Sequence, residues 1–159
     1  MKPAEPSQAL TIRRFRAEDT GDVVDLWLSC DLVRPANDPW RDIARKQKVG
    51  GDLFLVATLA DKIIGSVMAG YEGHRGWVNY VAVGPRHRRQ GIGRRLMEEA
   101  ERLLRAEGCP KINLQVRSSN LAVVAFYKAM GFAQDDVISL GKRLVPDGGP
   151  SGPQAARKD

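Results

Sequence analysis

The chain has few cysteines and no long apolar run, and both absences restrict what it can be. Cys30 and Cys109 are the only two cysteines among 159 residues, and neither belongs to a C-x-x-C or Cys/His cluster typical of disulfide frameworks or metal sites. No apolar run approaches the roughly 18 to 20 residues that would span a bilayer. The first residues also lack the apolar stretch of a signal peptide. We therefore expect free thiols, no metal, no membrane association and a cytoplasmic location.

The sequence also has no internal repeat and no second hydrophobic core. A domain of about 150 residues buries roughly 68–70% of the surface of its unfolded chain, so it needs neither disulfides nor metals to fold. Residues 145–159 are mainly Pro, Gly and polar residues, which is typical of a disordered tail. The sequence thus predicts a flexible terminus at 1–9, one domain at 10–144 and a disordered tail at 145–159.

Acidic residues are missing from one part of the chain. The formal net charge is +6, yet residues 1–76 carry 11 basic and 11 acidic side chains, so the whole excess lies in the second half. Within that half, residues 86–95 contain five arginines and no acid. A basic segment of this kind indicates nucleic acid, an anionic membrane or a phosphorylated ligand as the partner.

Hydrophobic periodicity predicts a mixed α/β domain. Alternating or apolar runs predict strands, and a 3.6-residue period predicts helices. Asp38 before a proline matches a helix N-cap, and Gly108 with a nearby proline matches a helix end. The predicted strands are 10–15, 53–59, 62–71, 77–83 and 111–116, with one or two final strands at Phe132 and 137–144, and the predicted helices are 18–30, 39–49, 92–107 and 120–130.

A loop rich in glycine and arginine lies between a predicted strand and a long amphipathic helix. Amide groups at a helix N-terminus lack internal partners and carry partial positive charge, so this pattern is typical of an anion site. It is not a dinucleotide fingerprint or a P-loop, because Leu96 replaces the third glycine and no Gly-Lys-Ser/Thr is present. A side chain at Gly91 or Gly93 would keep a ligand off the backbone. Charged hydrogen bonds would come from Arg88, Arg89 and Arg94. The alternative is a solvated basic turn.

A second signal follows the strand predicted over 111–116. Asn120 and Tyr127 are seven residues apart, close to two helical turns, so both side chains project from one face of a helix. They are either the lining of a cleft or an N-cap and a half-buried core tyrosine. The order of the two signals, each after a strand, favours the cleft.

Together these segments resemble the GNAT superfamily of acetyl-CoA-dependent N-acetyltransferases over about residues 10–144. The two anchors are residues 88–93 (RRQGIG) and 120–132. Further segments are similar to the YpeA-type bacterial acetyltransferases: 30–35, 37–39, 70–76, 108–112 and 139–144. The resemblance implies an α/β (α+β) GNAT fold, with a mixed, mostly antiparallel sheet splayed at the middle and helices on both faces.

The resemblance also implies an acetyl-CoA site. The pantetheine arm would lie in the split between the strands at 77–83 and 111–116, and backbone amides of the glycine and arginine loop would hold the pyrophosphate. Carried over position by position, the cofactor contacts are Val81, Ala82, Val83, Arg88, Arg89, Gln90, Gly91, Ile92, Gly93, Arg94, Asn120 and Tyr127.

The implied reaction is direct attack of an amine on the thioester carbonyl. Neither cysteine lies on the cofactor motifs, which disfavours an acetyl-cysteine. Tyr127 would protonate the departing thiolate, because a phenol with a pKa of about 10 is protonated at neutral pH. The base stays open, since similar ribosomal-protein alanine acetyltransferases carry a glutamate where this chain has Gln115. Glu72 is one candidate base, and His74, Asp31 and a water relay are the others.

The acceptor follows from these expectations. Without a strong base, a low-pKa α-amine on a small molecule, amino acid or peptide or protein N-terminus is favoured over lysine. The walls of its pocket are expected from loops outside the cofactor motif, with the side chains Asp31, Arg34, Asn37, Glu72, His74 and Arg75. A homodimer is possible. The alternative functions are an acyl-CoA sensor without catalysis and a basic nucleic-acid-binding module, and acetyl-CoA is preferred because the arginines cluster around glycines.

Overall fold

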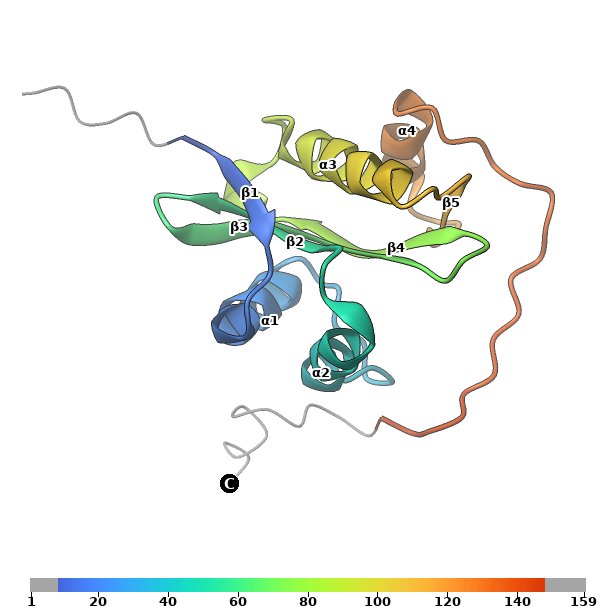
Figure 1. Cartoon of the computed structure of the whole chain (residues 1–159), viewed down its shortest axis with the longest axis horizontal. Helices are drawn as coiled ribbons and strands as arrows, with labels where there is room; N and C mark the ends of the chain where they lie inside the picture. The colour runs from blue at the N-terminus through green and yellow to red at the C-terminus, as the bar shows by residue number, and fades with distance from the viewer. Residues whose placement is uncertain (1–8, 148–159) are drawn as a thin grey trace, which may run out of the picture.

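A central sheet with two helices on each face forms the described part of the molecule (Figure 1). A computed structural model of the chain describes residues 9–147. The strands are β1 (Thr11–Arg14), β2 (Phe54–Leu59), β3 (Lys62–Tyr71), β4 (Gly76–Val83) and β5 (Ile112–Leu114). The helices are α1 (Thr20–Ser29), α2 (Pro39–Gly50), α3 (Ile92–Ala106) and α4 (Leu121–Ala129), with single-turn 3₁₀ helices at Ala17–Asp19 and Pro85–His87.

The sheet has five strands in the order β1-β2-β3-β4-β5. The first four form an antiparallel meander, whereas β5 returns parallel to β4 after the crossover through α3. α1 and α2 cover one face, and α3 and α4 cover the other (Figure 1). This arrangement confirms the predicted mixed, mostly antiparallel sheet with helices on both faces.

Residues of β2 alternate between two hydrophobic cores. Leu55 and Ala57 pack with α3 and α4, whereas Phe54 and Val56 pack with α1 and α2. Because side chains of a strand point to opposite faces in turn, a strand covered on both faces is apolar at every position. This double coverage explains the continuous apolar run of β2, and it holds the middle of the sheet rigidly under the site.

Local signals in the sequence set the helix ends as predicted. The Asp38 side chain accepts hydrogen bonds from the N–H groups of Trp40 at 3.0 Å and Arg41 at 3.3 Å, which caps the start of α2. Beyond the end of α3, Gly108 has a φ of 83°, the left-handed conformation typical of a helix C-terminus. Cys30 and Cys109 are free thiols, as expected.

The final strands predicted at Phe132 and 137–144 are wrong. Residues 133–147 form no strand and leave the body of the domain as an extended segment (Figure 1). The apolar side chains of this segment are among the most exposed of the described residues. β-prone residues form a strand only where a partner strand is available, and within residues 9–147 this segment has none.

The two predicted flexible ends fall largely on residues 1–8 and 148–159, which lie outside the described residues. One part of the predicted tail is described, however. The Asp147 side chain is buried, and it accepts hydrogen bonds from both terminal nitrogens of Arg45 at 2.7 and 2.8 Å. Within residues 9–147, no helix is long and apolar enough to cross a membrane.

Candidate active site

β4 and β5 diverge at the centre of the molecule. They pair only from Gly76–Val78 to Ile112–Leu114, and beyond Val78 the remaining residues of β4 have no partner on this side. β5 is therefore shorter than the predicted strand, and Gln115 and Val116 leave the sheet. A cavity of about 720 Å³ fills the split. Its walls come from β4, from β5 and the residues after it, from α4, from α2 and from the loop between α1 and α2.

A bulge in β4 turns backbone groups into this cavity. The register between β3 and β4 shifts between Ser66 and Met68, and Tyr80 has a φ of 50°, which is uncommon outside glycine. Ser66 Oγ donates to the Tyr80 carbonyl at 2.8 Å, so this carbonyl faces β3. Because the following peptide bond is trans, the N–H of Val81 points the opposite way, into the split.

The ladder also directs the Val83 peptide groups away from β3. The N–H of Gly84 donates to the carbonyl of Ile64 at 2.8 Å, and neighbouring residues of an antiparallel strand alternate in direction. The Val83 carbonyl accordingly accepts from Cys30 Sγ and from Arg88 Nε, each at 3.3 Å. Cys30 was not expected at the site, yet its thiol lies beside the end of β4.

Side chains from α1, β3 and α2 hold the bulge in place. Trp27 Nε1 donates to Ser66 Oγ at 2.9 Å, and the Trp27 ring stacks on the Tyr80 ring with centroids 3.7 Å apart. The Tyr80 hydroxyl donates to Asp42 Oδ2 at 2.6 Å. Burial and this carboxylate raise the pKa of Tyr80 above its ordinary value, so the phenol stays protonated. α1 and α2 thus fix the backbone of β4 from the opposite face of the sheet.

The substitution Ser66→Ala tests whether the bulge in β4 depends on these contacts. The substitution leaves the indole N–H of fully buried Trp27 without an acceptor and frees the Tyr80 carbonyl. We expect the free energy of unfolding in urea to fall by about 1–3 kcal/mol, and kcat/KM to fall because the bulge relaxes. Ser29→Ala, which removes a hydroxyl bonded only near its own helix end, is the control. Equal urea curves for the two variants would contradict this account of the bulge.

The glycine and arginine loop joins the end of β4 to α3. Arg89 and Gly91 adopt left-handed conformations with φ of 62° and 75°, and no side chain caps α3 at Gly91. A Cβ at Gly91 would meet no atom within 4 Å, so the space beside the start of α3 is open at this residue. A Cβ at Gly93 would instead point inwards, 3.5 Å from Phe126 and 3.6 Å from Val83. This direction does not support the expectation that a side chain at Gly93 keeps a ligand off the backbone.

This loop fits a phosphate group. Uncapped N–H groups at a helix N-terminus bind anions, and the exposed Arg88, Arg89 and Arg94 supply further donors. The loop residues do not line the cavity themselves. They adjoin it, because Arg88 bonds to Val83 and Gly93 lies against Val83 at the end of β4. An elongated ligand with a phosphate at one end can therefore extend from the loop into the split.

Asn120 and Tyr127 both line the cavity from α4, as their spacing predicted. Asn120 also caps the helix, because its Oδ1 accepts from the N–H of Val123 at 3.4 Å. Tyr127 is 8% exposed and packs edge-on against Phe126 and Phe132. Burial raises the pKa of Tyr127 to about 12, and its hydroxyl bonds to no residue that the structure describes. A protonated phenol with a free hydroxyl thus borders the cavity.

Comparison with known proteins identifies the family of this chain and supports its fold. A family model described as the acetyltransferase (GNAT) family matches residues 20–132. The chain belongs to this family. It is an acetyltransferase.

Two curated relatives carry acetyltransferase names. Acetyltransferase SG1711 from Sodalis glossinidius (strain morsitans) is 49% identical over 87% of this chain and 98% of its own length. Acetyltransferase ECA0875 from Pectobacterium atrosepticum is 49% identical over the same shares. Among solved structures, Ard1 from Thermoplasma volcanium is 25% identical with a TM-score of 0.68, over 79% of this chain and 83% of that one. Chaetomium thermophilum Naa20 in complex with a bisubstrate analogue is 30% identical with a TM-score of 0.62, over 76% and 69%.

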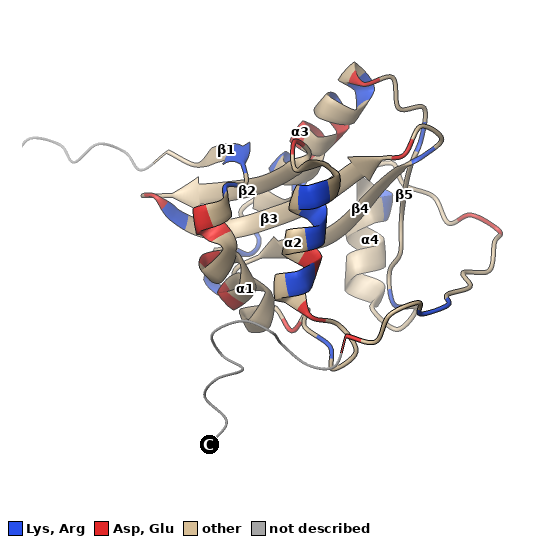
Figure 2. Ribbon diagram, turned by 60° about the horizontal axis from the view of Figure 1, so that its bottom comes forward, with Lys and Arg blue, Asp and Glu red and all other residues tan. Residues whose placement is uncertain are grey.

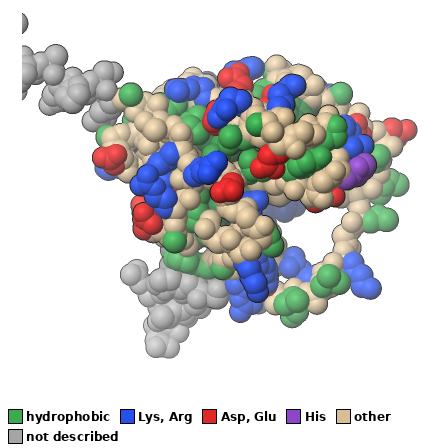
Figure 3. All heavy atoms as spheres, viewed as in Figure 1, with side chains coloured by type: hydrophobic (Ala, Val, Ile, Leu, Met, Phe, Trp, Pro, Cys, Tyr) green, Lys and Arg blue, Asp and Glu red, His purple; other side chains and the backbone are tan. Residues whose placement is uncertain are grey.

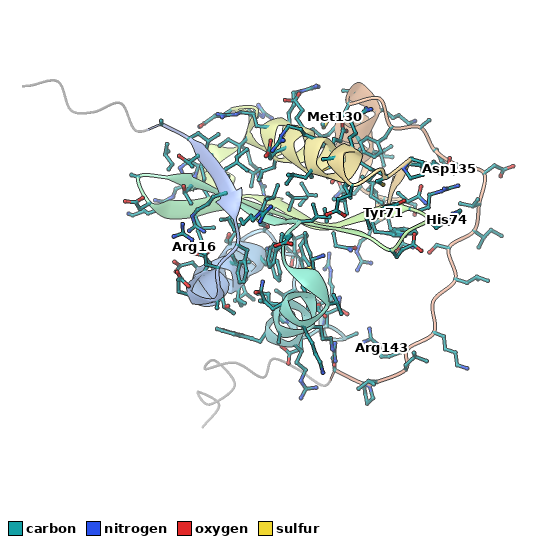
Figure 4. The ribbon with its side chains drawn as sticks, in the orientation of Figure 1. Arg16, Tyr71, His74, Met130, Asp135 and Arg143 are labelled. Carbon is teal, nitrogen blue, oxygen red and sulfur yellow. The ribbon has the colours of Figure 1, made fainter. Side chains whose placement is uncertain are left out.

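Three of the six residues predicted to line the acceptor pocket of this acetyltransferase lie at the cavity. Asp31, Arg34 and Asn37 line it from the loop after α1. The other three, Glu72, His74 and Arg75, lie in the turn between β3 and β4 and do not line it. Figure 4 shows His74 in this turn, at the end of the hairpin that is remote from the bulge.

Glu72 has a structural role in that turn. Its carboxylate accepts from the N–H of His74 at 2.9 Å and from the N–H of Arg75. These backbone hydrogen bonds hold the pKa of Glu72 below its usual range, although the residue is exposed. This carboxylate is bonded to the backbone of its own turn and does not line the cavity, so its position gives no support to the expected role of Glu72 as the base.

Residues of α2 were missed by the sequence analysis. Asp42, Lys46 and Val49 follow the i, i+4, i+7 spacing of one helix face, and this face lines the cavity. Lys46 is half-buried, its ammonium group donates to the Ala69 carbonyl at 2.5 Å, and burial lowers its pKa. Figure 2 shows several basic residues, coloured blue, along the ribbon of α2. The helical spacing was available in the sequence, but the direction in which the face points depends on tertiary packing.

Proposed function

We propose that this acetyltransferase transfers the acetyl group of acetyl-CoA to the α-amino group of a small molecule, an amino acid or a peptide or protein N-terminus. The amine attacks the thioester directly while both substrates are bound. The observation that carries the proposal is one continuous cavity, which runs from Tyr127 and Asn120 on α4, through the split, to the loop after α1. Two ligands can therefore meet inside the split from opposite faces of the sheet.

Coenzyme A fits the α4 side of the cavity. The uncapped start of α3 and its arginines suit the diphosphate. The N–H of Val81 and the peptide groups of Val83 face the split, where a pantetheine arm with its own amides would add to β4 as a strand does. Naa20, 30% identical to this chain, binds a bisubstrate analogue, and this supports simultaneous occupation of the two sides. We also place the chain in the YpeA-type branch, on segments such as 30–35 and 70–76.

Tyr127 serves as the acid. Its pKa of about 12 keeps it protonated at every working pH, and its hydroxyl is available to a departing thiolate. Bound acetyl-CoA supplies the activated acyl group. The N–H of Val81, a residue that lines the cavity, would stabilise negative charge that develops on the acyl oxygen, and the N–H of Val83 would remain for the pantetheine arm.

The acceptor side favours an amine that is already neutral. Lys46 forms no ion pair in the described part of the chain, and like charges disfavour protonation of an amine placed nearby. Gln115 lines the cavity where related enzymes carry a carboxylate, and an amide is not a base. At pH 7 roughly 10% of an α-amine but only about 0.04% of a lysine is neutral, from reference pKa values of about 8 and 10.4.

A screen of amines that follows release of free thiol from acetyl-CoA tests the proposal. Matched pairs such as a peptide with a free α-amine and the same peptide with only its lysine free isolate the group that reacts. We expect α-amines to react at least about a hundredfold faster at pH 7, and initial rates that fit a ternary complex. Equal rates on lysine would overturn the α-amine assignment. If the protein bound acetyl-CoA but released no thiol with any amine of a broad panel, it would be an acyl-CoA sensor.

A further inference from the structure

The extended segment after α4 exposes more apolar surface than any other part of residues 9–147. We call residues 135–145 the strap. It contributes five of the nine large hydrophobic side chains that are exposed: Val137, Ile138, Leu140, Leu144 and Val145, at 78, 86, 91, 86 and 58%. Figure 3 shows the strap standing off the body, with an open gap behind it and hydrophobic side chains on its outer side. A contiguous apolar patch of this kind marks an interaction surface.

Three residues of the strap attach it to its own domain. Asp135 binds Lys111 Nζ at 2.7 Å, Ser139 accepts from the Gln115 side chain, and Arg143 donates to Asn37 at 3.2 Å. Figure 4 marks Asp135 and Arg143 near the two ends of the strap. These three residues are spaced by four, so they lie on one side of an extended chain.

The even-numbered residues lie on the opposite side, and their side chains form no hydrogen bond or ion pair within residues 9–147. Ile138, Leu140 and Leu144 are the three most exposed large hydrophobic residues of residues 9–147. Asp136 and Lys142 lie on the same side and form no ion pair in that part of the chain. From Asp136 to Lys142 the outward side therefore reads acid, apolar, apolar, base, and Leu144 follows at its end.

We propose that the strap is the interface of a homodimer in which the straps of two copies lie antiparallel. When the two straps are centred on Ser139, Ile138 of each copy lies opposite Leu140 of the other. The same register places Asp136 opposite Lys142, and two-fold symmetry repeats each contact. A second copy of this chain therefore supplies apolar cover for Ile138 and Leu140, and opposite charges for Asp136 and Lys142.

The strap borders the acceptor side of the cavity. Arg143 bonds to Asn37, which lines the cavity, and Asp147 just beyond the strap bonds to Arg45, which lines it as well. Each copy would therefore stand beside the acceptor entrance of the other. The interface involves none of the residues that carry the proposed reaction. The proposal of a dimer and the proposed function can therefore be tested, and can fail, independently of each other.

Sedimentation equilibrium of the full chain tests the proposal. We expect a mass of about 35 kDa for the wild type, twice the 17.5 kDa of one chain. Leu140→Arg should give 17.5 kDa at the same concentration. Leu121→Arg, at a residue 74% exposed on α4 outside the strap, is the matched control and should stay dimeric. Both positions are exposed, so far-UV circular dichroism should show intact folds.

Charge reversal tests the antiparallel register. Asp136→Lys and Lys142→Asp each turn two attractive contacts of the dimer into two repulsive ones, and we expect each to weaken dimerisation about tenfold. The double variant Asp136→Lys/Lys142→Asp restores opposite charges, and it should restore the wild-type dissociation constant. A monomeric wild type, a dimeric Leu140→Arg or a double variant weaker than both single ones would each overturn the proposal.

Discussion

Tyr127→Phe is expected to lower kcat by about a hundredfold and to change KM for acetyl-CoA by less than about twofold. A positioned acid contributes roughly 10²–10⁴ to a rate, and the phenol of Tyr127 is the protonated group on the α4 side of the cavity. The substitution keeps the ring that packs on Phe126 and Phe132, so ligand contacts through the ring persist.

The fold should not suffer from this substitution. The Tyr127 hydroxyl has no hydrogen-bond partner among the described residues, so its removal leaves no buried group unpaired. Tyr71→Phe is the matched control, because that hydroxyl bonds only to the Gly73 carbonyl at 3.1 Å, outside the cavity. Steady-state kinetics and thermal unfolding of both variants are the measurements. A Tyr127→Phe enzyme with wild-type kcat would remove this residue from the mechanism.

The raised pKa of Tyr127 also leads to a prediction for the pH dependence of kcat. Because burial raises its pKa to about 12, the acid form should persist across the range in which the enzyme is stable. Between pH 7 and 10 we therefore expect kcat of the wild type and kcat of the Tyr127→Phe variant to have the same pH dependence. The wild type should show no additional decline in this range. A decline near pH 9 present only in the wild type would mean that the phenol titrates much earlier than its burial indicates.

Gly91→Ala is expected to raise the dissociation constant of coenzyme A by at least about tenfold. A Cβ at this position projects into the open space beside the start of α3, where a diphosphate would lie. The variant should also lose about 1–2 kcal/mol of stability, because the φ of 75° is strained for alanine.

Gly108→Ala separates these two effects. Gly108 has a φ of 83° beyond the other end of α3, and a Cβ there also meets no atom within 4 Å. Its variant should lose similar stability yet bind coenzyme A as the wild type does. Gly93→Ala should bind nearly normally as well, since its Cβ points towards Phe126. Calorimetric titration and thermal unfolding of the three variants give the answer, and equal binding by all of them would place the diphosphate elsewhere.

Features set by neighbouring residues were predicted from the sequence. The Asp38 cap, the end of α3 at Gly108 and the common face of Asn120 and Tyr127 depend on local spacing alone. The split was expected only through the family resemblance. Its depth depends on β5 ending at Leu114, which no local signal in the sequence marks.

Features that join distant residues were not predicted. The bulge at Tyr80 rests on Trp27 and Ser66, 39 residues apart in the chain, and no periodicity reveals such a contact. Glu72 was a plausible base by residue type, but the hairpin carries it away from the split. The strap reads as a strand because its residues favour one, whereas the sheet within residues 9–147 offers it no partner.

The central claim is that the split between β4 and β5 binds acetyl-CoA along β4 and at the start of α3. Backbone amide chemical shifts during titration with coenzyme A test it most directly. The account predicts the largest changes at Val81, at Val83 and across residues 89–94, with smaller ones at Asn120 and Tyr127. Changes concentrated at the β1 edge or in the turn at 72–75, with Val81 and Gly91 unmoved, would contradict it.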